Sequence, residues 1–128
     1  RKFCEENLCG NYGLVPACPP ACGTAEEMRE KALAYKKALV LQTILTQSQA
    51  DPAVFKKAKH EHNILTEKLA GRLDAAGTDD LLLMSAGPYS RHSCMCAYGI
   101  EAQKMADAAG MVCWADDGNT RFFSQILF

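Results

Sequence analysis

Residues 4–22 read CEENLCGNYGLVPACPPAC, and this stretch decides how the first part of the chain can fold. It contains four of the seven cysteines, with the spacing C-x4-C-x8-C-x3-C. The residues between them are rich in Gly, Asn, Pro and Ala, and they follow neither a helical nor a strand pattern. A short irregular segment with little apolar surface cannot be stabilised by burial alone. We therefore expect a metal, a metal cluster or disulfides to hold it in place.

The run Cys18–Cys22, CPPAC, is the most informative part of this stretch. Its two prolines fix φ and remove two backbone donors, so a helix cannot continue between the two thiols. A proline directly after a ligand cysteine also occurs in iron–sulfur ligand runs. Gly10 and Gly13 would let the backbone turn sharply or approach a bulky inorganic group closely. These features favour an iron–sulfur cluster.

Zinc and disulfides are the alternatives. Structural zinc sites usually contain C-x2-C to C-x4-C pairs, often with histidine, whereas here no C-x2-C pair occurs and no histidine lies nearby. Seven cysteines are an odd number, and residues 23–93 contain none, which is unlike a secreted disulfide framework. We therefore place a [4Fe–4S] cluster first, zinc or another single metal second, and disulfides or free thiols third.

The same residues carry a resemblance to a known family. The run Cys4…Cys9-Gly-Asn-Tyr-Gly…Cys18-Pro-Pro, followed by Tyr35-Lys-Lys-Ala-Leu-Val-Leu-Gln, resembles a family of predicted metal-binding proteins of unknown function. That family is found mostly in anaerobic bacteria and methanogenic archaea. The similarity returns at three later motifs, which are Ser85-Ala-Gly-Pro, Met95-Cys-Ala-Tyr-Gly-Ile-Glu and Ala106-Asp-Ala-Ala-Gly.

The resemblance implies metal binding, and it carries over to this chain at the N-terminal cysteines. Members usually have a second group of cysteines after the Ala-Gly-Pro step, but Tyr89 stands where the first of them is expected. Cys94 and Cys96 lie where the family more often has Ser and Glu. The predicted cluster ligands are Cys4, Cys9, Cys18 and Cys22, and Cys94 and Cys96 are secondary candidates.

The remaining pattern predicts an α/β fold, a small mixed sheet of three to four strands with flanking helices and an N-terminal cysteine-rich metal-binding arm. We expect one domain over residues 1–128, with the arm at 1–23 and the α/β core at 24–128. The first three strands should be parallel and the last antiparallel. The expected helices begin at Thr24, with Glu27 completing a capping box, at Asp51-Pro52, and at Tyr98. The expected strands are 38–46, 81–84, 111–115 and 120–128, the last two forming a hairpin over the turn 116–119.

Two histidine-containing regions complete the set of candidates. In the helix at 52–75, an apolar stripe should face the core, with His62 at its edge and His60 in solvent; the stripe comprises Val54, Phe55, Ala58, His62, Leu65, Leu69 and Leu73. Residues 89–96 should form a loop at the carboxyl end of a buried strand, where open α/β sheets place their sites. This loop holds Arg91, His92, Cys94 and Cys96, and its two cysteines could be ligands, an exposed redox pair or buried bystanders.

The charge and composition of the chain limit the classes of function to be expected. The net charge is −1, which gives no electrostatic reason to expect nucleic acid or an anionic membrane as a partner. Clustered thiols fit a reducing cytoplasm. No G-x-S-x-G elbow, P-loop or dinucleotide fingerprint is present, so the sequence leaves open whether the protein is an enzyme. We expect electron transfer or a redox accessory role in anaerobic metabolism, with a protein redox partner. The alternative is a structural zinc-binding scaffold or interaction protein without catalytic activity.

Overall fold

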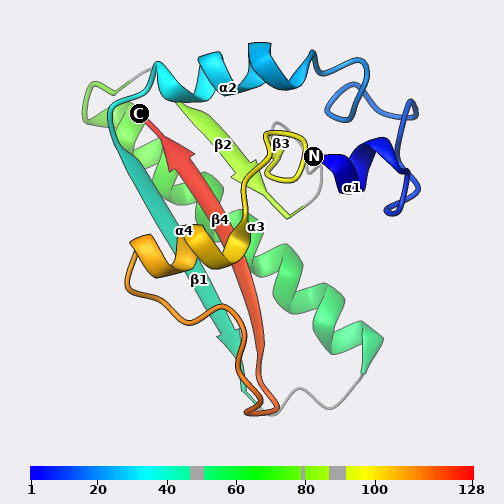
Figure 1. Cartoon of the computed structure of the whole chain (residues 1–128). Helices are drawn as coiled ribbons and strands as arrows, with labels where there is room; N and C mark the ends of the chain where they lie inside the picture. The colour runs from blue at the N-terminus through cyan, green and yellow to red at the C-terminus, as the bar shows by residue number, and fades with distance from the viewer. Residues whose placement is uncertain (47–50, 79, 87–91) are drawn as a thin grey trace.

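The computed structural model describes residues 1–46, 51–78, 80–86 and 92–128 and has an α/β fold with a four-stranded mixed sheet (Figure 1). The strands are β1 (Ala38–Leu45), β2 (Leu82–Ser85), β3 (Ser93–Cys94) and β4 (Thr120–Leu127). The helices are α1 (Lys2–Glu5), α2 (Ala25–Leu33), α3 (Pro52–Ala75) and α4 (Ala102–Ala108). The predicted fold class, a small mixed sheet with flanking helices, is confirmed.

The last strand in the sequence lies in the middle of the sheet. The strand order is β1-β4-β2-β3, and β4 is antiparallel to both β1 and β2 (Figure 1). Ser124, for example, lies opposite Leu41 on one side and Ser85 on the other. As predicted, the strands β1 and β2 therefore run in the same direction and the last strand opposes them, but β1 and β2 are not neighbours.

The predicted strand at 111–115 and its hairpin are wrong. This segment is irregular, and it leaves Val112 52% and Trp114 79% exposed. The side-chain amide of Gln42 in β1 donates a hydrogen bond to the Val112 carbonyl oxygen at 2.6 Å, so a side chain fixes the segment in place of a backbone ladder. The parallel partner of β2 is instead the two-residue strand β3.

Each face of the sheet has its own apolar core. On one face α4 packs against strand residues that include Met84, Phe123 and Leu127. On the other face α3 packs through Ala70 against Leu83 and Ile126. In Figure 1, α4 lies in front of the sheet and α3 behind it. Because both faces are covered, all six residues from Phe122 to Leu127 are buried.

The two long helices start as the sequence predicts. Thr24 and Glu27 form the predicted capping box: Glu27 N–H donates to Thr24 Oγ1 at 3.1 Å, and Thr24 N–H donates to the Glu27 carboxylate at 2.8 Å. Asp51 caps α3 by accepting from Ala53 N–H at 2.9 Å, with Pro52 as the first helical residue. The helix predicted from Tyr98 is shorter, because residues 98–101 precede α4 as turns and extended backbone.

The predicted apolar stripe of α3 is partly wrong. Val54, Phe55 and Leu65 are 47%, 45% and 44% exposed. The buried residues of the helix are His62, Asn63, Thr66 and Ala70. His60 is exposed, as predicted.

A polar network explains why this face of α3 can be buried. His62 Nδ1 is 2.6 Å from Thr43 Oγ1, and His62 Nε2 is 3.0 Å from Ser124 Oγ. Thr66 Oγ1 is 2.6 Å from the same Ser124 hydroxyl. Burial lowers the pKa of His62, and the proximity of His92 lowers it further. Because each of these buried polar groups has a partner, the helix packs here without an apolar stripe.

Candidate metal centre

The structure brings three cysteines of the N-terminal segment and the pair Cys94 and Cys96 to one cavity. This cavity has a volume of about 250 Å³, and the described residues that line it are five cysteines and five others. The cysteines are Cys4, Cys9, Cys18, Cys94 and Cys96. Cys94 ends β3 and Ala86 follows β2, so the cavity lies at the carboxyl ends of two parallel strands, where the sequence predicts a site.

Cys4 is the most constrained of these thiols. It lies in α1, is 4% exposed, and packs with Met28, Cys94 and Ala97. Burial, together with a hydrogen bond to Cys96, raises the pKa of Cys4 to about 12. Because metals bind the thiolate, occupation of the cavity would release a proton from this group.

Cys18 is held by the proline loop. It is 5% exposed, and the Cys22 N–H donates a hydrogen bond to its carbonyl oxygen at 3.2 Å. Gly13, whose φ is +73°, donates its N–H to the Pro19 carbonyl at 2.8 Å, which closes the loop on itself. Burial raises the pKa of Cys18, and the nearby charges of Cys94 and Cys9 raise it further. Local backbone bonds therefore aim this buried thiol at the cavity.

Cys22 lies beside the cavity but is not among the residues that line it. Its Sγ is 3.4 Å from Met28 Sδ and 3.9 Å from an Arg1 nitrogen. The Arg1 guanidinium also donates to the Gly23 carbonyl at 2.6 Å and to the Ala97 carbonyl at 3.1 Å. Arg1 therefore ties the first helix to α2 and to the segment after β3, a role that no sequence pattern indicated.

The structure therefore gathers Cys4, Cys9 and Cys18 from the predicted ligand set, together with both secondary candidates. Which of them bind metal stays a prediction. A C-x-C pair after a buried strand was the sequence signal for Cys94 and Cys96. Cys113 lies elsewhere, buried in the core beside α4.

Two further site predictions concern the histidine-containing loop. His92 is buried away from the cavity lining, with its Nε2 3.4 Å from Glu67 Oε1. Tyr89 and Arg91 lie outside the described residues. Within the described ranges, no three or more His, Cys, Asp or Glu side chains are already arranged to hold a single metal ion. All seven cysteines, each in the described part of the chain, are free thiols.

The fold and the cavity define a small α/β protein with a cluster of cysteine thiols, the residue type whose thiolate soft metals and metal clusters bind. The chain belongs to the family of predicted metal-binding proteins DUF2284, whose family model matches residues 1–94. Comparisons with curated proteins and with solved structures give no match. The match includes four of the five cysteines that line the cavity, and it ends before Cys96. No helix in the described ranges is long and apolar enough to cross a membrane.

Proposed function

We propose that this protein holds a [4Fe–4S] cluster in the thiol cavity and exchanges single electrons with a protein partner. The observation that carries the proposal is a cavity of about 250 Å³ lined by five cysteines in a chain of a metal-binding family. Such a cluster needs four thiolates, and it supplies one-electron redox chemistry when bound.

The size of the cavity favours a cluster over a single ion. The sulfur centres of four thiolates that bind a zinc ion at about 2.3 Å lie on a sphere of roughly 50 Å³. The cavity is several times larger than that. Its lining thiols can therefore surround a multinuclear group without first collapsing onto one point.

Three of the proposed ligands are Cys4, Cys9 and Cys18, which both the sequence spacing and the cavity support. The fourth thiolate comes from Cys22 or Cys96. Cys22 completes the N-terminal spacing, whereas Cys96 lines the cavity and is close enough to Cys4 to raise the pKa of that thiol. The position of Cys96 favours it over Cys22.

The other lining residues would control the surroundings of the cluster. Phe3, Tyr12 and Pro19 contribute apolar surface to the cavity wall. Low polarity and exclusion of water are levers by which proteins set cluster potentials. The proposed setting is a reducing cytoplasm, where free thiols persist.

Anaerobic iron, sulfide and zinc analysis combined with a visible absorption spectrum tests the proposal. The parent should contain about four irons per chain and absorb in the visible, as a [4Fe–4S] protein does. Cys18→Ser should lose both signals. Cys113→Ser is the matched control, because it removes a buried thiol outside the cavity and should retain them.

Two further variants decide the fourth ligand. If Cys96 is that ligand, Cys96→Ser should lose iron while Cys22→Ser keeps it, and the reverse result would assign Cys22. One zinc per chain and no visible absorption would reject the cluster and identify the cavity as a structural zinc site.

A further inference from the structure

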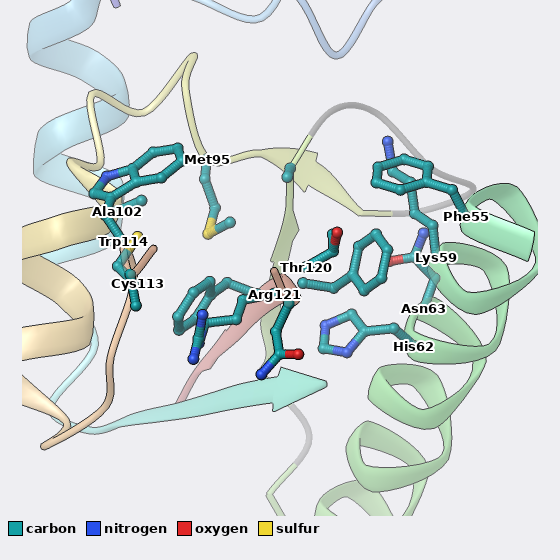
Figure 2. A pocket seen from close by; sticks show the side chains of 15 residues that line it. Phe55, Lys59, His62, Asn63, Met95, Ala102, Cys113, Trp114, Thr120 and Arg121 are labelled. Carbon is teal, nitrogen blue, oxygen red and sulfur yellow. The ribbon is translucent and has the colours of Figure 1, made fainter. Parts of the chain in front are cut away.

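A second pocket, of about 400 Å³, shares Ala86 with the lining of the thiol cavity and has a different character. Figure 2 shows the side chains that line it. Phe55, Lys59, His62 and Asn63 of α3 form one side of it, and Cys113 and Trp114 lie on the opposite side. Thr120 and Arg121, at the start of β4, lie between them (Figure 2). Pockets of this size, mostly apolar with a few polar groups, are typical of small-molecule sites.

The walls of the pocket are aromatic. Trp114 is 79% exposed although it lines a pocket, and Phe55 is 45% exposed. The ring of Phe55 packs against that of Phe122 with centroids 5.0 Å apart and planes tilted by 59°. A flat ring inserted between these walls would cover apolar surface that the chain itself leaves open to water.

The charged groups of the pocket are cationic. Lys59 and Arg121 line it, and no carboxylate is among its described lining residues. The Arg121 side chain is 9% exposed, and its two terminal nitrogens bind Asp117 at 3.2 Å and 2.6 Å. Its Nε is buried and has no hydrogen-bond partner among the described residues.

We propose that this pocket binds a planar aromatic molecule that carries an anionic group. The ring lies between Trp114 and Phe55, and the anionic group lies near the Lys59 and Arg121 side chains that line the pocket. Ala86 lines both this pocket and the thiol cavity. Met95, which lines this pocket, lies in the sequence between Cys94 and Cys96, which line the thiol cavity. A bound molecule would therefore lie next to the proposed cluster site, although its binding does not depend on a cluster.

Binding of two matched dyes to the full chain tests the proposal. The anion 8-anilinonaphthalene-1-sulfonate and the uncharged N-phenyl-1-naphthylamine share the aromatic frame and differ in the sulfonate. Trp114 is the sole tryptophan of the chain, so its emission reports bound dye, and the charge variants below test whether the dye lies in this pocket. We expect the anion to bind with one-to-one stoichiometry, to quench Trp114 emission, and to bind more tightly than the neutral dye.

Charge variants separate the pocket from nonspecific dye binding. Lys59→Gln should weaken binding of the anionic dye about tenfold, the size of one charge-assisted contact, and leave the neutral dye unchanged. Lys56→Gln, also on the exposed surface of α3 but absent from the pocket, is the matched control and should change neither. Equal losses for both dyes, equal effects of the two lysine variants, or no quenching of Trp114 would overturn the proposal.

Discussion

Residues 1–23 and the sheet are stabilised in different ways. In the sheet, six consecutive residues of β4 are buried between two helical layers. In the first 23 residues only Cys4, Cys18 and Pro19 are buried, while Phe3, Leu8 and Leu14 are 53%, 60% and 73% exposed. The sheet can therefore be stable through apolar burial, whereas we expect the N-terminal segment to depend on the metal or cluster proposed for its thiols.

Metal removal should produce the largest difference between the two regions. Under anaerobic chelation, we expect amide hydrogen exchange in residues 1–23 to accelerate on the order of a hundredfold, because the segment loses its main stabilising interaction. Exchange in β4 should stay slow. Unchanged protection of residues 1–23 would contradict the comparison, and so would equal acceleration in β4.

A substitution that leaves a cavity in the sheet core should destabilise the sheet and leave the metal site unchanged. Ile126 is fully buried on the α3 face, so Ile126→Ala should lower the free energy of unfolding by about 2–5 kcal/mol. Urea denaturation measures this loss, and metal content should be unchanged in the absence of urea. The control is Ile44→Ala on β1, which removes a 48% exposed side chain and should cost less than about 1 kcal/mol.

The buried histidine should make the stability of the core depend on pH. The folded state lowers the pKa of His62, so the unfolded state binds more protons once the pH falls below about 6.5. The free energy of unfolding should therefore fall between this pH and the lower folded pKa, by at most about 1.4 kcal/mol per pH unit from this group.

Urea titrations of the parent and of His62→Gln at pH 7 and pH 5.5 measure this dependence. The variant should be less stable at pH 7, since it disturbs the contacts with Thr43 and Ser124, but its stability should fall less on acidification. An equal fall in the free energy of unfolding of both proteins would show that a group other than His62 causes the pH dependence.

The smallest expected effect lies at the boundary between the two regions. Thr24→Ala removes the capping box of α2 and should cost about 1 kcal/mol of unfolding free energy. Thr24→Ser should restore most of it. Thr46→Ala, at an exposed position after β1, should stay within about 0.5 kcal/mol of the parent. Equal costs at Thr24 and Thr46 would show that the cap does not stabilise this boundary.

Local sequence signals predicted a helix or strand well where the residues that determine it are neighbours in the sequence. The caps at Thr24 and Asp51 and the apolar runs at 38–46 and 81–84 depend on neighbours in sequence, and the structure confirms them. The run at 111–115 is equally apolar, yet it is not a strand. Apolar composition alone does not say which strands pair, and β4 takes the central position.

The buried face of α3 and the outline of the thiol cavity depend on distant residues. Burial of His62 and Thr66 requires Ser124, about sixty positions later in the chain, which no helical periodicity can indicate. Likewise the spacing of the first four cysteines says nothing about Cys94 and Cys96, because β3 brings them to the cavity. Residue types at the site were predictable, and their long-range combination was not.

The central position of β4 also constrains synthesis on the ribosome. β1 and β2 each pair with β4 and not with each other. Neither apolar core can therefore form while residues 120–127 are still inside the exit tunnel. Until then the thiols of the N-terminal segment have no finished sheet to pack against. Assembly of the folded site therefore waits until residues 120–127 have left the ribosome, and the cysteines of the N-terminal segment stay exposed on the nascent chain until then.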